Sequence, residues 1–576
     1  MLPFDEILTR YLGELGWYQW WVLFLMCYAE MPVGFHQLIA NFLAASPSHH
    51  CSVPGLETWR DCRPISDALN MSIPWTTLDG GGSGYSECSR YDLPEGSFNM
   101  SSAAFWQNHS PESLSAGGTI SCDRGWEYDC TTYTSTIVTE WDLVCSNKGL
   151  RQLTTSLYMV GVSLGSLGFG DLADRIGRRR TYLLSLAIQC VFGVATAFSP
   201  HVVLFIIFRM FVGAATSGVI NTSAVMVAEF VGPKERVKVG VLRPVFFSVG
   251  AMILAGVAFG VRDWRALQLA VSLPNLLFIP FYWWCPESPR WLLSRDKEKA
   301  KKLIQKMAKF NRVDLPDHVF ADDPSHVDDV KRKKEKEKDE THKSYTILDI
   351  LRKPNTRKRS LIIFFIWFTN NIVYYGIALN ITDLSGDVYT NSLIASAVEI
   401  PAYLTLLFLQ ERFGRKLPVF AYLLLTGIGL IVTAALPAGP GRVAVAMISR
   451  FCITGGFQST MIYTVELFPT VTRNIGMGFS STAGRIGSIV SPFVWLLADL
   501  WRPAPYILFG VMTVVAGLLC MLLPETKGEQ LPQTLEDGEE FGKGVAAAVF
   551  NKALRTLKIK KPEKKEERGS GNAGYI

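Results

Sequence analysis

Charged residues are scarce in this chain of 576 residues. Asp, Glu, Lys and Arg together make up 19% of it, whereas apolar residues make up 49%. This composition excludes an intrinsically disordered chain and is unusual for a soluble enzyme. The 57 basic and 51 acidic residues leave a formal charge of only +6, so a nucleic-acid partner is not expected.

Motifs typical of enzymes are also missing. The sequence has no Gly-x4-Gly-Lys-Ser/Thr phosphate loop and no His-Glu-x2-His, and its 8 histidines are scattered. The first absence argues against chemistry driven by ATP, and the second argues against a zinc protease. We therefore expect neither an enzyme nor a bound metal or cofactor. We recognise no cleavable signal peptide, since Asp5 and Glu6 lead directly into the first apolar stretch.

Long apolar segments dominate the chain instead. About twelve of them are long enough to cross the roughly 30 Å hydrocarbon core of a bilayer as helices. The sequence therefore predicts an all-α membrane protein whose two termini lie on the same side. The predicted spans are 18–44, 151–172, 182–199, 202–228, 238–261, 265–284, 360–380, 390–409, 417–436, 441–465, 476–500 and 504–523.

Basic clusters between the spans predict the orientation. The clusters at 175–180, 331–343, 412–416 and 558–568 all fall on one face, which the positive-inside rule makes cytoplasmic. The predicted organisation is a cytoplasmic N-terminus (1–17), a first helix (18–44), an extracellular loop (45–150), the rest of an N-terminal bundle (151–285), a cytoplasmic linker (286–359), a C-terminal bundle (360–523) and a cytoplasmic tail (524–576).

The first loop contains six of the eleven cysteines. An even set on the extracellular side predicts three disulfides, although six cysteines allow fifteen pairings and the sequence does not choose among them. Their wide and irregular spacing is poor for zinc. The cysteines are Cys51, Cys62, Cys88, Cys122, Cys130 and Cys145, and the same loop has glycosylation sequons at Asn70, Asn99 and Asn108.

The two halves of the chain repeat each other. Asp-Arg-Ile-Gly-Arg-Arg at 174–179 matches Glu-Arg-Phe-Gly-Arg-Lys at 411–416, and Glu-x6-Arg at 229–236 matches 466–473. Pro-Glu-Ser at 286–288 matches Pro-Glu-Thr at 524–526. This indicates two duplicated six-helix bundles with a substrate path between them. The repeated acids and arginines suit ion pairs that gate the path: Asp174, Arg175, Arg179, Glu229, Arg236, Glu411, Arg412, Glu466 and Arg473.

These motifs, together with Pro-Glu-Ser-Pro-Arg-Trp-Leu-Leu at 286–293 and the six-cysteine loop, resemble the organic cation/anion/carnitine transporter family of solute carriers in the major facilitator superfamily. The resemblance covers essentially the whole chain. It implies the major facilitator fold of 12 helices in two pseudo-symmetric bundles, with a disulfide-rich loop between helices 1 and 2. It also implies transport of small organic ions by alternating access.

Aromatic and amide residues on the seventh span are candidates for substrate binding. Trp367, Asn371 and Tyr374 share one helical face, with Tyr375 beside them. Aromatic faces attract quaternary ammonium groups, and Trp367 and Tyr374 match the aromatic cavity of the related cation transporters. The alternative is an interfacial aromatic belt, but this cluster reaches the middle of the span.

Charged residues inside spans give a second set of candidates, because such charges are costly in lipid. Glu399 lies in the eighth span and Arg485 in the eleventh. Glu399 is either a counter-charge for a cationic substrate or a partner for Arg485. Arg485 stands where cation transporters of the family carry an aspartate, and an arginine there is the pattern of anion and carnitine members. Gln458, Tyr463 and Ser481 complete the predicted site; Glu30, His36, Asn41 and Arg243 are candidates of lower weight.

Glu399 and Arg485 together suit a zwitterion, with an ammonium near Glu399 and a carboxylate at Arg485. We therefore expect a multi-pass plasma-membrane carrier of carnitine-like zwitterions or quaternary ammonium compounds, working as a monomer among membrane lipids. The alternatives are an organic anion exchanger, a cation uniporter and a non-transporting receptor, of which the intact gate motifs disfavour the last. Val33 departs from the pattern of sodium-coupled carnitine transporters, so sodium coupling stays open.

Overall fold

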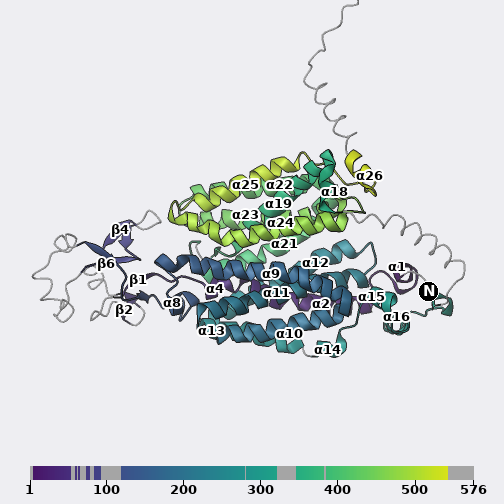
Figure 1. The fold of residues 1–576 in the computed structure, drawn as a ribbon, viewed down its shortest axis with the longest axis horizontal. Coiled ribbons are helices and arrows are strands. Elements are labelled where there is room, and N and C mark those ends of the chain that lie inside the picture. Colours follow the sequence, from purple (N-terminus) through teal and green to yellow (C-terminus); the bar gives the residue numbers. More distant parts are fainter. Residues whose placement is uncertain are drawn as a thin grey trace, which may run out of the picture.

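The computed structural model describes residues 4–52, 59–60, 63–64, 73–77, 83–92, 118–278, 280–320, 346–381 and 384–541. Two helical bundles lie side by side with their axes roughly parallel (Figure 1). Short strands extend from one end of the pair, which we call the disulfide-loop end. The helices α1 (Phe4–Ile7), α15 (Pro289–Arg295), α16 (Lys297–Asn311) and α26 (Leu535–Glu540) lie at the opposite end, which we call the linker end (Figure 1).

The N-terminal bundle matches the first six predicted spans. In the sixth span the α-helix gives way to a 3-10 helix at Leu273, and the first span is divided at Ala29 and Ile39. Its elements are α2 (Trp17–Tyr28), α3 (Glu30–Leu38), α4 (Ala40–Leu43), α9 (Lys148–Ile176), α10 (Arg178–Ala197), α11 (Val202–Phe230), α12 (Arg236–Gly260), α13 (Trp264–Ser272), η4 (Leu273–Phe278) and α14 (Phe281–Trp284).

The C-terminal bundle matches the other six spans, with the eighth divided at Val398. Its elements are α19 (Pro354–Ala378), α20 (Val388–Ala397), α21 (Glu399–Phe413), α22 (Lys416–Ala435), α23 (Pro440–Leu467), α24 (Arg473–Val494), η7 (Trp495–Asp499) and α25 (Ala504–Cys520).

Eight helices of the described chain are long and apolar enough to cross a membrane. The segments of the sixth, tenth, eleventh and twelfth predicted spans are too short or not apolar enough to be counted among these eight. α25 has only 17 residues, whereas α23 and α24 carry arginines within their spans, Arg450 and Arg485.

Two disulfides hold the loop at the disulfide-loop end. They join Cys51 to Cys122 and Cys88 to Cys145, and Cys130 is also disulfide-bonded. Cys62, Asn70, Asn99 and Asn108 lie outside the described residues. The strands form two-stranded antiparallel pairs: β1 (His49–Cys51) with β8 (Trp126–Tyr128), β2 (Trp59–Arg60) with β3 (Arg63–Pro64), β4 (Trp75–Thr77) with β5 (Ser83–Tyr85), and β6 (Ser89–Tyr91) with β7 (Thr119–Ser121). The short helix α8 (Ile137–Trp141) and η3 (Cys145–Asn147) lead into α9.

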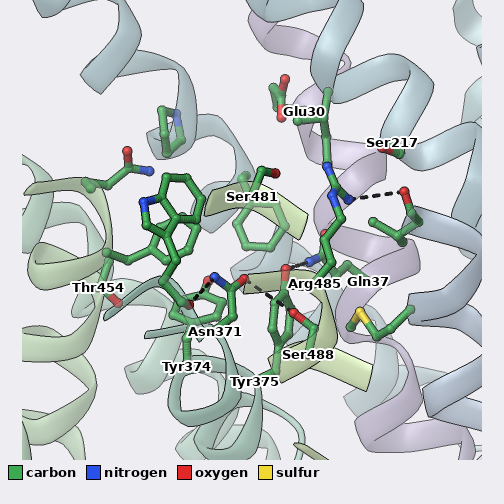
Figure 2. A pocket seen from close by; sticks show the side chains of 18 of the residues that line it. Glu30, Gln37, Ser217, Asn371, Tyr374, Tyr375, Thr454, Ser481, Arg485 and Ser488 are labelled. Carbon is green, nitrogen blue, oxygen red and sulfur yellow. Dashed lines mark hydrogen bonds between the residues drawn. The ribbon is translucent and has the colours of Figure 1, made fainter. Parts of the chain in front are cut away.

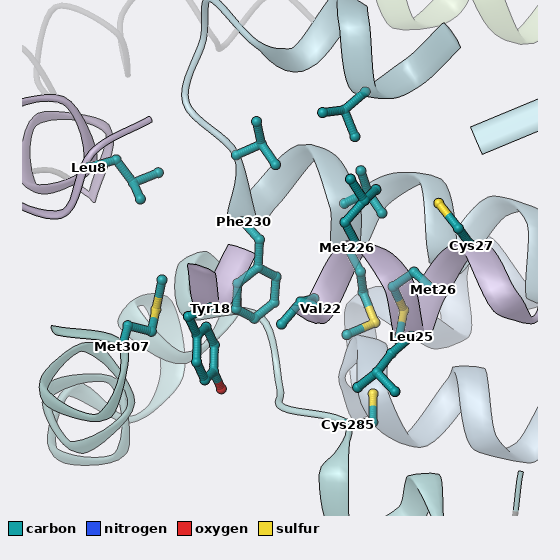
Figure 3. Packing of buried hydrophobic residues seen from close by; sticks show 14 of the residues in the cluster. Leu8, Tyr18, Val22, Leu25, Met26, Cys27, Met226, Phe230, Cys285 and Met307 are labelled. Carbon is teal, nitrogen blue, oxygen red and sulfur yellow. The ribbon is translucent and has the colours of Figure 1, made fainter. Parts of the chain in front are cut away.

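Short helices cover the linker end. They are α1 (Phe4–Ile7), η1 (Leu8–Leu12), α15 (Pro289–Arg295), α16 (Lys297–Asn311), η5 (Asp317–Phe320), α18 (Ile347–Arg352) and α26 (Leu535–Glu540). An apolar cluster joins α16 to the bundle, where Met307 packs with Tyr18 and Phe230 (Figure 3). This packing fixes the helices of the predicted linker against the first bundle.

Several contacts between the bundles lie toward the disulfide-loop end. Asn41 donates a hydrogen bond to the carbonyl oxygen of Ala378 at 2.8 Å, and the rings of Phe42 and Tyr389 stack 5.7 Å apart. Lys148 pairs with Asp499. These contacts hold the disulfide-loop end of the path closed.

Candidate substrate cavity and gate

A cavity of about 210 Å³ lies between the bundles. A water molecule needs only about 10–15 Å³ by such a measure, so the space suits a small organic molecule. Side chains from both bundles surround it (Figure 2). The lining residues come from α3 (Glu30, Gln37), α9 (Met159, Val162, Ser163), α11 (Ser217, Ile220), α12 (Arg243, Pro244, Phe247), α19 (Trp367, Asn371, Tyr374, Tyr375), α21 (Tyr403), α23 (Thr454, Phe457, Gln458) and α24 (Ser481, Arg485, Ser488).

Most of the predicted site residues meet at this cavity. Those that line it are Trp367, Asn371, Tyr374, Tyr375, Gln458, Ser481 and Arg485. Hydrogen bonds fix their orientation: the indole of Trp367 donates to the hydroxyl of Thr464 at 2.9 Å, and Ser488 donates to the amide oxygen of Asn371 at 3.3 Å. The close spacing along α19 places its aromatic residues on the cavity wall (Figure 2).

Arg485 is the charge in the cavity without a carboxylate partner among the described residues. Its guanidinium donates to the carbonyl oxygen of Val162 at 3.1 Å, across the interface between the bundles. The other charged lining residues, Glu30 and Arg243, pair with each other. The cavity therefore carries one excess positive charge that is free to meet an anionic group.

Glu399 does not pair with Arg485, which was one of the two alternatives that the sequence left open. Its carboxylate is 1% exposed and pairs with the guanidinium of Arg450, a residue the sequence analysis did not single out. Tyr374 donates to the same carboxylate at 3.0 Å, and Ser248 of the other bundle donates at 2.6 Å. Glu399 is thus neutralised behind Tyr374 and is not among the lining residues of the cavity.

Tyr463 also lies away from the cavity. It is fully buried and donates a hydrogen bond to the carbonyl oxygen of Pro524, near the linker end. Tyr463 follows the lining residue Phe457 by six residues, so the two side chains point to different sides of α23. The sequence alone did not show which side faces the cavity. The aromatic lining that the sequence analysis missed is Phe247, Tyr403 and Phe457, whose apolar or isolated character gave no signal.

The candidates of lower weight divide between the cavity and the interior of the first bundle. Glu30 and Arg243 line the central cavity. His36 is fully buried, and its carbonyl oxygen accepts a hydrogen bond from Arg209 at 3.1 Å. Asn41 lines a second, smaller cavity.

The gate motifs fold into the same arrangement in both bundles. Arg178 pairs with Asp174 at 2.8 Å and with Glu229 at 3.3 Å, and Arg415 pairs with Glu466 at 3.0 Å. The arginines that reach Glu229 and Glu466 are those that directly follow the glycine of each motif, Arg178 and Arg415, which the sequence analysis did not name as gate residues.

A glycine with positive φ ends the helix before each of these arginines. Gly177 has φ 103° and Gly414 has φ 87°. A Cβ at Gly177 would lie 2.4 Å from a carboxylate oxygen of Glu287, and one at Gly414 would lie 2.7 Å from a carboxylate oxygen of Glu525. Only glycine accommodates both the backbone conformation and the close approach.

Glu525 accepts hydrogen bonds from several backbone N–H groups at the start of α22 and beyond α25. They come from Arg415 at 2.8 Å, Lys416 at 3.1 Å, Thr526 at 2.9 Å and Lys527 at 3.0 Å. Burial raises the pKa of Glu525, but these donors outweigh it and the pKa is lowered overall. Glu287 accepts from the backbone of Arg178 at 2.9 Å and of Arg179 at 3.1 Å in the first bundle.

Several other predicted gate residues make contacts outside these pairs. Arg175 pairs with Asp171 at 2.8 Å, Arg236 pairs with Asp5 at 2.8 Å, and Arg473 donates to the hydroxyl of Thr470 at 3.2 Å. The guanidinium of Arg412 lies 5.8 Å from the ring of Phe413, and the carbonyl oxygen of Glu411 accepts from Lys527 at 2.5 Å.

Comparison with known proteins identifies the family. A family model described as sugar (and other) transporter matches residues 101–537. The chain is 40% identical over 546 residues to the organic cation transporter protein of Drosophila melanogaster, covering 94% of this chain and 95% of the relative. It is 35% identical over 549 residues to organic cation/carnitine transporter 2 of Homo sapiens, covering 93% and 94%. The chain belongs to the solute carrier 22 branch of this major facilitator family.

The family also includes solute carrier family 22 member 6-B of Xenopus laevis, which is 34% identical over 542 residues, covering 93% of this chain and 95% of the relative. A solved structure of the xylose transporter XylE from E. coli, in an inward open conformation, matches with a TM-score of 0.58 at 16% identity, covering 91% of this chain and 100% of that one. This likeness shows the fold. The protein is a multi-pass membrane transporter of organic ions and not an enzyme.

Proposed function

We propose that this protein carries small organic ions that bear a carboxylate across the plasma membrane. The observation that supports this most is Arg485, whose guanidinium lines the cavity without a carboxylate partner among the described residues. A buried charge is costly unless it is paired, and a substrate carboxylate would supply the missing partner. Glu399 offers no equivalent site for a cation, since Arg450 already neutralises it.

A carnitine-like zwitterion is the second candidate substrate, favoured by the aromatic wall. The ring of Trp367 lies 5.8 Å from that of Phe457, and the ring of Tyr374 lies 6.0 Å from it. Such faces attract a quaternary ammonium without a carboxylate anchor. The sequence analysis placed the ammonium of a zwitterion near Glu399. In the revised hypothesis, the aromatic residues hold the ammonium and Arg485 holds the carboxylate.

The proposed transport cycle is alternating access with the disulfide-loop end extracellular. Disulfides form in oxidising compartments, and the basic clusters assign the linker end to the cytoplasm. Rocking of the bundles would open the contacts between Asn41 and Ala378 and between Lys148 and Asp499. The ion pairs at Arg178 and Arg415 would hold each bundle rigid at its cytoplasmic end during that motion.

Uptake into a heterologous cell tests the proposal. Labelled p-aminohippurate, carnitine and tetraethylammonium are compared with and without sodium, and each is normalised to surface protein. We expect saturable uptake of the anion or of the zwitterion, and no uptake of tetraethylammonium comparable to either. Transport of tetraethylammonium alone would contradict the proposal, and loss of uptake on sodium removal would assign the coupling ion.

Trp367 distinguishes the two candidate substrates. Replacing Trp367 with leucine removes a π face and is expected to weaken an ammonium-bearing substrate by about 1–2 kcal/mol, or roughly tenfold in half-saturating concentration. A substrate without an ammonium should change much less. Trp367→Phe keeps a π face and is the matched control. An equal loss for carnitine and p-aminohippurate would show that Trp367 supports the fold rather than the ammonium.

A further inference from the structure

A second, smaller cavity lies between the bundles on the disulfide-loop side of the first. Its volume is about 20 Å³. It is lined by Ala40, Asn41, Ala44, Arg151, Gln152, Thr155, Leu379, Asn380 and Pro492. No residue of this set appears in the lining of the central cavity, so the two are separate in this structure.

The same helix faces line both cavities. On α9, Arg151 and Thr155 line the small cavity, and Met159 and Val162 line the central one. These positions are spaced three or four residues apart and therefore form one continuous face.

Three other segments repeat this pattern. Gln37 of α3 is followed one turn later by Asn41 of α4. Tyr375 of α19 is followed by Leu379, and Ser488 of α24 is followed by Pro492. The two cavities thus lie one after the other along a single path.

Hydrogen bonds between the bundles separate the two cavities. Gln37 bonds to the hydroxyl of Tyr375, and Ser156 donates to the carbonyl oxygen of Ile489 at 2.9 Å. Asn41 bonds to the carbonyl oxygen of Ala378. The small cavity is therefore the part of the path that lies beyond the closed outer barrier.

The chemistry of the small cavity is polar and positive. Arg151 is partly buried and pairs with no carboxylate among the described residues, and no acid lines the cavity. Asn41 is 6% exposed, and its amide oxygen has no hydrogen-bond partner in the described part of the chain. A buried acceptor without a partner lacks a hydrogen-bond donor, which only water or a ligand could supply in a cavity that has room for about one water molecule in this state.

We propose that this cavity is an outer docking subsite, where Arg151 receives the carboxylate of an extracellular substrate before it passes to Arg485. This inference rests on the proposed function. Arg151 and Val162, the residue that accepts from Arg485, are separated by eleven positions on α9, which is about 16 Å at the helical rise per residue. The amide oxygen of Asn41 accepts a hydrogen bond from a donor on the substrate or on its hydration shell.

The test compares the two sides of the membrane. Half-saturating concentrations of labelled p-aminohippurate and carnitine are measured for uptake from outside and for efflux from the cytoplasmic side. Arg151→Gln is expected to raise the outside value about fivefold, as for one partly exposed charge contact, while the cytoplasmic value stays within about twofold. Arg502→Gln removes a charge from an exposed position between α24 and α25 and should change neither value.

Each outcome has a distinct meaning. An unchanged outside value in Arg151→Gln, with wild-type protein that transports these substrates, overturns the docking subsite and leaves the proposed function intact. Equal shifts on both sides, or a shift that Arg502→Gln reproduces, also overturn it. Wild-type protein that transports neither substrate overturns the proposed function and this inference together. Arg151→Lys keeps the charge and is expected to restore most of the outside affinity, which a folding defect would not do.

Discussion

Arg485→Ala is expected to abolish saturable uptake of carboxylate-bearing substrates. Removing one partner of a desolvated charge pair costs about 2–5 kcal/mol, so transport efficiency should fall by about thirtyfold or more. Among the described residues, Arg485 donates a hydrogen bond to the carbonyl oxygen of Val162 and pairs with no carboxylate. Its loss therefore leaves no buried acid unpaired, and the amount of protein at the cell surface should hold.

Charge-preserving and charge-reversing variants sharpen this prediction. Arg485→Lys keeps the positive charge but loses the planar donor fork, so partial activity with weaker affinity is expected. Arg485→Asp should reject the carboxylate and favour simple cations such as tetraethylammonium. The measurement is labelled uptake normalised to surface protein. Unchanged p-aminohippurate and carnitine uptake in Arg485→Ala would refute the assignment of Arg485 as the carboxylate anchor.

The helical architecture could be predicted because its causes are local in the sequence. Apolar segments of membrane-spanning length and a repeat offset shared by three motifs indicate two duplicated bundles without knowledge of any contact. Much of the cavity lining could be predicted for the same reason. Trp367, Asn371 and Tyr374 share a face of α19, and polar or aromatic groups in apolar spans face protein rather than lipid. The relatives confirm the family, and the structure places these side chains on one cavity.

The pairing of buried charges could not be predicted in this way. Glu399, Arg450 and Arg485 each lie inside a different apolar span. No pattern in the sequence shows which of the two arginines pairs with Glu399. The choice depends on how α21, α23 and α24 pack, which no local pattern records. The gate shows the same limit on a smaller scale, since the backbone turn at Gly177 or Gly414 decides which neighbouring arginine reaches the acid.

Arg450→Ala is expected to reduce the mature protein at the cell surface severely, whatever the substrate. It leaves the carboxylate of Glu399, which is 1% exposed, without its counter-charge. Breaking a buried pair in this way costs about 3–5 kcal/mol, which is a large part of the stability of a typical domain. The guanidinium also lies 4.0 Å from the ring centre of Tyr374 and donates to its carbonyl oxygen at 2.9 Å, so the cavity wall should loosen as well.

A double-mutant cycle separates this structural role from substrate binding. If Glu399 and Arg450 act as a pair, the combination of Glu399→Gln with Arg450→Gln should recover more surface protein than Arg450→Gln alone, since neither charge is then left unmatched. The readouts are surface biotinylation and the thermal stability of purified protein. If Glu399→Gln instead folds normally and selectively weakens ammonium-bearing substrates, Glu399 serves as a cation anchor after all. The hydrogen bond of Ser248 to Glu399 across the bundles, at 2.6 Å, would then link that anchor to their relative motion.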